Sequence, residues 1–288
     1  MTRIRIITCF AVALLNPALI QAQGREPQQG MEDLQDTFKL NKHEPAQIRV
    51  EVDAGEVRVA KGNSSDEVRV GLHYDKTLYH HTFRFSESRN TLDITFDRQK
   101  WFDRDGDQEA AELALELPTE AELHLDYKIK AGKIDMQLGG LKIADMAMET
   151  MAGEVNVDFK EPNRIDMANL DLNTKVGESK FIHLGNARFR DADINGGIGE
   201  MTIDFTGEMA KDAVARVDLD IGETAIILPR EAGTKLSVSK FLFLSHFDLP
   251  YELRQDGRYY FTENYDRADQ TFQLRVSSGL GECRVELR

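Results

Sequence analysis

The stretch Gly199-Glu200-Met201-Thr202-Ile203 repeats a pattern that stands earlier in the chain as Gly177-Glu178-Ser179-Lys180-Phe181. In each copy a glycine, usually followed by glutamate, precedes apolar residues at every second position. Seven such glycines occur: Gly55, Gly132, Gly153, Gly177, Gly199, Gly222 and Gly281. From the second to the sixth they recur with a nearly constant period of about 22 residues, which is typical of a solenoid, in which each repeat forms one coil.

Side chains that we expect to point inward alternate on both sides of each glycine, but the phase shifts there. Upstream they lie five, three and one residues before the glycine, as in Leu172, Thr174 and Val176. Downstream they lie two, four and six residues after it. Within one flat strand this shift would turn the core face outward, so the pattern predicts a corner at each glycine. Glycine suits a corner because it adopts positive φ and lets two backbones approach closely.

A third, shorter apolar pair in each repeat predicts a three-sided coil, as in Leu141 with Ile143 and Ala187 with Phe189. The predicted fold class is therefore all-β: a parallel β-solenoid of about 22-residue coils with irregular β caps at both ends. An antiparallel sandwich is the alternative, but it gives no reason for a constant period and phase. In the solenoid, the residues four after each glycine form one buried column: Val59, Met136, Val157, Phe181, Ile203, Ile226 and Val285.

The chain begins with the charged, apolar and small-residue order of a secretory signal peptide at residues 1–22. No later apolar run reaches the roughly 20 residues of a membrane-spanning helix. We therefore expect an exported protein, periplasmic or extracellular, with no transmembrane segment after signal cleavage.

The rest of the chain divides by its periodicity. We expect a polar lead-in over residues 23–47, disordered as far as about Thr37, and an N-terminal coil with a β cap over 48–122. Regular coils follow over 123–239, and a C-terminal cap with a final coil over 240–288. The apolar segment 241–251 is expected to contain a short helical stretch.

Net charge and cysteine content narrow the possible partners. The net charge of −14 argues against nucleic acid, which requires a basic surface, and leaves an unknown envelope protein or polymer as the partner. Signal cleavage would remove Cys9 and leave Cys283 alone, so no internal disulfide is expected. Cys283 stands two residues after a corner glycine, and we expect a buried structural thiol there.

Three groups of residues are candidates for metal sites, and none is expected to be one. The segment 103–107 resembles a calcium loop, but glutamine and alanine stand where the loop requires glycine and glutamate. His80 and His81 are adjacent in a strand and point to opposite faces, so they do not readily share a zinc ion. His183 lies six residues after Gly177, which predicts a satisfied interior residue.

Enzymatic activity is not expected, and no catalytic or cofactor-binding residues are assigned. Sugar-cleaving sites require exposed aromatic platforms and a spaced pair of carboxylates. The regular coils contain no tryptophan, and Trp101, the only one in the chain, lies beside the acidic segment. Coils as short as these also leave little length for site-bearing loops.

The repeats resemble the toast-rack, or putative-adhesin, β-solenoid family of secreted bacterial proteins, and are similar to the C-terminal domains of cell-wall-active antibiotic response proteins. The resemblance covers about residues 48–288. It rests on the glycine-acid corners and on Leu184-Gly185-Asn186-Ala187, Gly196-Gly197-Ile198-Gly199-Glu200, Asp204-Phe205-Thr206-Gly207, Ile227-Leu228-Pro229 and Asn264-Tyr265-Asp266-Arg267-Ala268. It implies the fold, and it implies no catalytic residues.

The function predicted from the sequence is that of an exported, non-enzymatic structural or interaction module of the bacterial cell envelope. Two alternatives remain: a protein that binds or cleaves polysaccharide, and a cation-dependent adhesive module. The second arises because Glu154, Glu178, Glu200 and Glu223 follow successive corner glycines and would stack in one column.

Overall fold

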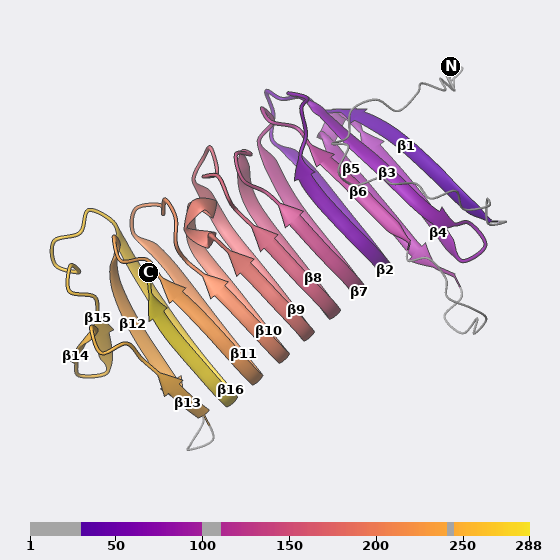
Figure 1. Cartoon of the computed structure of the whole chain (residues 1–288). Coiled ribbons are helices and arrows are strands. Elements are labelled where there is room, and N and C mark those ends of the chain that lie inside the picture. The colour runs from indigo at the N-terminus through magenta and orange to yellow at the C-terminus, as the bar shows by residue number, and fades with distance from the viewer. Residues whose placement is uncertain (1–29, 100–110, 241–244) are drawn as a thin grey trace, which may run out of the picture.

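The computed structural model describes residues 30–99, 111–240 and 245–288, and within them the chain is almost entirely β-structure (Figure 1). The predicted signal peptide at residues 1–22, the acidic segment 103–107 and Trp101 lie outside the described residues. The strands are β1 Met31–Lys39, β2 Ala46–Lys61, β3 Glu67–Asp75, β4 Tyr79–Ser86, β5 Thr91–Arg98, β6 Glu112–Leu117, β7 Leu123–Gln137, β8 Ile143–Asp158, β9 Met167–Ile182, β10 Phe189–Asp204, β11 Ala213–Leu228, β12 Gly233–Lys240, β13 Ser245–Asp248, β14 Arg254–Asp256, β15 Tyr259–Phe261 and β16 Thr271–Leu287. Two short 3-10 turns are η1 Glu87–Arg89 and η2 Leu184–Ala187.

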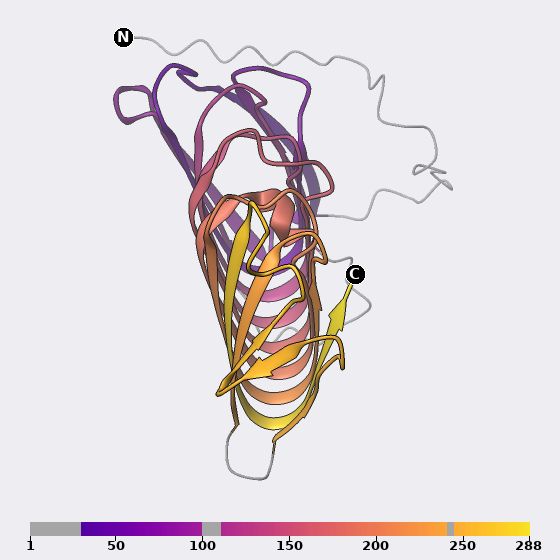
Figure 2. The same cartoon turned by 90° about the vertical axis from the view of Figure 1, so that its left-hand side faces the viewer.

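Long bent strands form the body of the molecule. Strands β2, β7 to β11 and β16 are 15 to 17 residues long, and each carries one corner glycine. Viewed along the stack, each strand runs down one arm, bends, and returns up the other arm in a U (Figure 2). Neighbouring strands are parallel and in register, so each corner glycine pairs with the next from Gly55 to Gly281. The predicted parallel stack is thereby confirmed.

The prediction of a third short strand in each coil is wrong. Leu141 lies in a loop and Ile143 begins β8, while Ala187 lies in η2 and Phe189 begins β10. The apolar pair therefore spans the end of a loop and the start of the next long strand. Each regular coil has two arms and a loop that closes the top of the U.

Both ends of the stack depart from the regular coil. At one end β5 and β6 pair with β2 before and after its glycine, so two short strands replace one long strand. At the other end β12 and β13 pair with β16 in the same way. β13 occupies residues 245–248 of the segment in which a helical stretch was expected, so the prediction is wrong there, and residues 241–244 lie outside the described residues.

The expected disordered lead-in is wrong from Met31 onward. β1 pairs antiparallel with β3 along its whole length, from Met31 opposite Asp75 to Lys39 opposite Glu67. Leu34 and Phe38 pack against the core from this strand. β1 lies at the edge of the sheet and most of its residues are polar. Because few of its side chains pack against the core, its sequence did not indicate a strand.

Sequence order and spatial order differ at both ends of the glycine ladder. β16 lies between β11 and β12, so Gly222 pairs with Gly281 although β12 to β15 come between them in the sequence. Gly55 likewise pairs with Gly132, and β3 to β6 come between these two glycines. Strands β3 to β6 and strands β12 to β15 are therefore insertions in the sequence, and the ladder of paired glycines continues past them.

The core lies between the two arms of the U. The predicted column four residues after each glycine is fully confirmed, since all seven side chains are at most 4% exposed. Three phenylalanines, Phe189, Phe205 and Phe272, pack together beside it with ring centroids 4.9 to 6.3 Å apart.

Candidate functional site

The outermost part of each bend is a run of exposed backbone and side chains around the corner glycine. In β9, the residues from Lys175 to Glu178 are all exposed, while Thr174 and Ser179 on either side are buried. The seven corner glycines have φ between +134° and +146°, a region that favours glycine. The inward face therefore ends three residues before the glycine and resumes two residues after it.

The prediction that the residue before each glycine points inward is wrong for four coils. Val176, Ile198, Ile221 and Leu280 are 49%, 54%, 46% and 38% exposed. The bend begins earlier than the alternation indicated: the register between β10 and β11 pairs Ile198 with Ile221 but skips Gly197 and Asp220.

These four side chains form a continuous apolar row on neighbouring strands, because Val176 pairs with Ile198, Ile198 with Ile221, and Ile221 with Leu280. An acidic row runs beside it and consists of Glu154, Glu178, Glu200, Glu223 and Glu282. We call the two rows together the corner ridge. The ridge follows the bends of the strands, which form the bottom of the U in Figure 2.

The acidic row is only partly neutralised. Lys180 Nζ lies 2.5 Å from Glu178 Oε1, and this bond is the main reason why the pKa of Lys180 is raised. Arg284 Nη2 lies 3.3 Å from Glu282 Oε1. Within the described part of the chain, Glu200 and Glu223 have no ion pair. Two adjacent carboxylates of the ridge are thus available to a partner.

A shallow hollow of about 170 Å³ opens beside these carboxylates. Glu200, Glu223, Glu282 and Arg284 line it, and the short side chains of Thr202 and Ala225 lie between them. Thr202 and Ala225 are partners on adjacent strands, so their small size leaves space on the outer face of β10 and β11. Inside the bend, a narrow cavity of about 20 Å³ is lined partly by Thr174 and Ser278, and it has room for about one water molecule.

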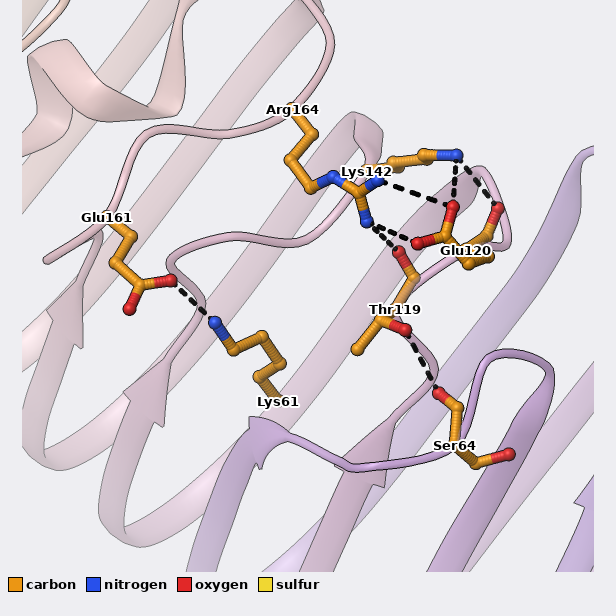
Figure 3. Close-up of polar contacts among 7 residues, drawn as sticks. All are labelled: Lys61, Ser64, Thr119, Glu120, Lys142, Glu161 and Arg164. Carbon is orange, nitrogen blue, oxygen red and sulfur yellow. Dashed lines mark hydrogen bonds and ion pairs between the residues drawn. The ribbon is translucent and has the colours of Figure 1, made fainter.

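The loops at the top of the U carry a separate polar network, drawn in Figure 3. Glu120 accepts hydrogen bonds from Lys142 Nζ at 2.8 Å and from Arg164 Nη1 at 2.7 Å. The bond from Arg164, followed by that from Lys142, lowers the pKa of Glu120 from its ordinary 4.5 to about 2. Arg164 Nη1 also donates to the Thr119 carbonyl oxygen at 2.8 Å. This cluster ties three successive loops together, and its carboxylate stays ionised at neutral pH, which suits it to a structural role.

Asparagine side chains hold the same loops to their neighbours. Asn163, 1% exposed, donates to the Ile143 and Ile165 carbonyl oxygens at 2.8 Å and accepts from the Ile143 N–H at 2.9 Å. Asn186 donates to the Phe159 carbonyl oxygen at 2.9 Å. Asn186 belongs to the Leu184-Gly185-Asn186-Ala187 motif, so this contact gives one of the family-like motifs a physical role. The role of Asn163 and Asn186 in holding the loops was not predicted from the sequence, although asparagine recurs between successive coils.

The histidines considered as metal ligands lie in polar or aromatic surroundings. His81 Nδ1 lies 2.9 Å from the Tyr74 hydroxyl, and burial is the main cause that lowers the pKa of His81. His183 is not an interior residue: it adopts φ +54° and its side chain is 40% exposed, while Nδ1 lies 2.8 Å from Asp158 Oδ1. Leu184 takes the buried place instead. Among the described residues, no group of three or more His, Cys, Asp or Glu has an arrangement suited to a metal ion.

Comparison with known proteins identifies the family. Residues 26–168 match the family model described as the N-terminal domain of toast_rack, DUF2154. The chain belongs to the toast-rack family. No curated protein matches it in sequence. Across the described ranges, no helix is long and apolar enough to span a membrane.

Several solved structures also match the chain. A putative cell adhesion protein from Clostridium sporogenes is 9% identical, with a TM-score of 0.44 over 89% of this chain and 100% of that chain. A putative adhesin from Bacteroides fragilis is 12% identical, with a TM-score of 0.41 over 91% and 100% of the two chains. A putative adhesin from Parabacteroides merdae is 9% identical, with a TM-score of 0.37 over 90% and 98%.

Proposed function

We propose that this protein is an exported, non-enzymatic module of the bacterial cell envelope that acts by binding another protein along its corner ridge. The observation that carries the proposal is the apolar row, in which four large side chains on neighbouring strands are 38% to 54% exposed. Contiguous apolar surface of this kind marks interaction sites, because its removal from water stabilises a complex. The signal-like order of residues 1–22 supports export.

The layout of the ridge supports a protein partner. An apolar strip bordered by charged residues matches the usual anatomy of an interface, with an apolar centre and a polar rim. The in-register strands fix the backbone of the apolar row, so little conformational entropy should be lost when a partner binds.

The acidic row indicates the chemistry of the partner. Glu200 and Glu223 have no ion pair with described residues, and the hollow of about 170 Å³ beside them can receive a long side chain. A lysine or arginine placed there would pair with these carboxylates. We therefore propose a partner segment that presents apolar side chains next to basic ones.

The irregular sheets at the two ends have a structural part in this proposal. We propose that β1 and β3 to β6 cap one end of the solenoid, and that β12 to β15 cap the other. A bare coil would expose unpaired strand edges to other chains, and capping units prevent this. The ridge is then the surface left for specific contact.

Site-specific photo-crosslinking in the native host tests the proposed contact. A photoreactive residue at Ile198 should give a discrete crosslinked protein, and one at Lys128, an exposed residue of β7, should not. The combined substitution Val176→Ser, Ile198→Ser and Ile221→Ser should abolish capture by a probe at Leu280. The control Ile182→Ser, at a half-buried apolar residue of β9, should leave capture intact.

Two outcomes would contradict the proposal. Equal crosslinking from Ile198 and Lys128 would show that the ridge is not the contact surface. Binding to purified cell-wall polymers that is unchanged by the triple substitution would favour the polysaccharide alternative, and turnover of such a polymer would make the protein an enzyme.

A further inference from the structure

A second hollow, also of about 170 Å³, lies near the C-terminal end of the stack. It opens on the arm that precedes the corner, where β11, β16, β12 and β15 lie side by side. Its polar lining comes from four separate segments: Arg216, Lys235, Ser237, Tyr259, Gln273 and Arg275. Three of these residues are cations, although the whole chain carries a net charge of −14.

The strand register brings these cations close together. Arg216 on β11 is the direct partner of Arg275 on β16, and Lys235 on β12 is the direct partner of Gln273 on β16. Neighbouring strands lie about 4.8 Å apart. Like charges directly opposite one another on adjacent strands are destabilising. An anion bound between them would relieve this repulsion.

Only part of this positive charge is neutralised by the protein. Arg216 Nη1 contacts both carboxylate oxygens of Asp193, at 3.0 and 3.2 Å. Lys235 and Arg275 have no carboxylate partner within residues 30–99, 111–240 and 245–288. Two of the three cations that line the hollow therefore carry a charge that no described carboxylate neutralises.

Tyr259 lines one side of the hollow and contacts two cationic side chains. Arg258 Nη2 lies 2.7 Å from the Tyr259 hydroxyl, and Lys235 Nζ lies 4.2 Å from the ring centroid. The hydrogen bond from Arg258 is the main cause that lowers the pKa of Tyr259, and the charges of Arg258, Lys235 and Arg275 add to it. The local potential is thus positive, as an anion site requires.

We propose that this hollow is a binding site for a phosphate group. Lys235 and Arg275 would bind the phosphate oxygens by charge-assisted hydrogen bonds, and Ser237 and Gln273 would donate further hydrogen bonds. Phosphate fits better than a single carboxylate because several cations converge on one small space. The site lies on the arm and not on the corner ridge, so it does not depend on the proposed protein contact.

Titration of the purified full chain with inorganic phosphate, at constant ionic strength set with chloride, tests the site. We expect saturable binding, followed by calorimetry and by a rise in melting temperature. The double substitution Lys235→Gln and Arg275→Gln should weaken phosphate binding by about tenfold or more, because it removes two charge-assisted contacts. Lys128→Gln, which removes an exposed cation on the same arm of β7, should leave binding unchanged.

Further measurements separate the sources of the phosphate group. Binding to phosphatidylglycerol vesicles that is lost in the double variant would support the site and place the phosphate on a lipid headgroup. Binding of inorganic phosphate without vesicle binding would support the site and a free or polymer-borne phosphate. Absence of phosphate binding, equal binding by the double variant, or equally tight binding of acetate would each overturn the proposal. An unchanged melting curve in phosphate-free buffer verifies that the double variant is folded.

Discussion

The carbonyl oxygen of Gly177 lies 1.8 Å from the place where a Cβ on Gly199 would stand. No side chain fits there, and Gly199 also adopts φ +144°, which L-residues rarely reach. The same contact recurs along the ladder, with the Gly199 carbonyl 1.8 Å from a Cβ placed on Gly222. The glycine repeat is thus required twice over, by backbone conformation and by the close approach of the preceding coil.

Replacing Gly199 with alanine should therefore cost at least about 1 to 3 kcal/mol of unfolding free energy or prevent folding. Gly71→Ala is the matched control, since Gly71 lies within β3 and its nearest atom would be 3.8 Å from the new Cβ. That change should be close to neutral. Urea denaturation of both variants measures the difference, and equal losses would show that the corner needs no glycine.

Cys283 should react slowly with thiol reagents in the native protein. The side chain is 0% exposed, as predicted from the sequence, and burial raises the pKa of its thiol to about 12. Only the thiolate reacts, so labelling at pH 8 should require unfolding. A variant with Ala225→Cys and Cys283→Ser provides a half-exposed thiol for comparison. Native labelling of Cys283 as fast as that of the comparison thiol would remove it from the core.

Glu120 should make the stability pH-dependent in acid. Its pKa is about 2 in the folded protein, below the ordinary 4.5, so folding favours the ionised form. The stabilising contribution is present above pH 4.5 and is lost as pH falls toward 2. Glu120→Gln should lower the melting temperature at pH 7, and the difference from the parent protein should shrink over this range. Glu149→Gln, at an exposed residue of β8, should show no such convergence.

Glu200→Gln should be neutral or slightly stabilising, and calcium should not change this result. The strands that carry neighbouring glutamates of the acidic row lie about 4.8 Å apart. At that distance the repulsion between two carboxylates in water is about 0.9 kcal/mol, and salt and splayed side chains reduce it further. Thermal melts in EDTA and in millimolar calcium measure both effects. A calcium-dependent gain that the variant loses would instead support the cation-dependent adhesive alternative.

Thr150→Val should stabilise the protein. Thr150 is 1% exposed, and its Oγ1 has no hydrogen-bond partner among the described residues. A buried, unsatisfied hydroxyl costs about 1 to 3 kcal/mol, and valine has nearly the same shape. Chemical denaturation should give a higher midpoint. A lower midpoint would show that the hydroxyl is satisfied in solution.

The stacked strands could be predicted because every coil repeats the same local requirement. A glycine at fixed spacing and a column of residues such as Val157 and Ile203 give mutually consistent signals. The position of Val176 could not be predicted by alternation, because the bend begins two residues before the glycine and turns this side chain outward. Alternation describes a flat strand, and a bend of several residues breaks it.

The pairing of strands that are far apart in the sequence also could not be predicted. Nothing in residues 271–287 indicates that β16 lies between β11 and β12. A strand with this pattern could equally pair beyond β12, at the end of the stack. The hollow lined by Arg216, Lys235, Tyr259 and Arg275 depends on that insertion. Its residues are scattered over three strands and a turn-flanked hairpin, and each alone looks like an ordinary exposed side chain.

The in-register stacking also determines how the molecule would respond to a pulling force. Its interstrand hydrogen bonds run along the stack, so tension between the two ends would load every bond of one ladder together. The long ladder between β10 and β11 shares such a load over most of its length, whereas β12 and β15 are joined by only three residue pairs. Under tension the terminal sheets should yield first, leaving the central coils as a stiff rod of fixed length.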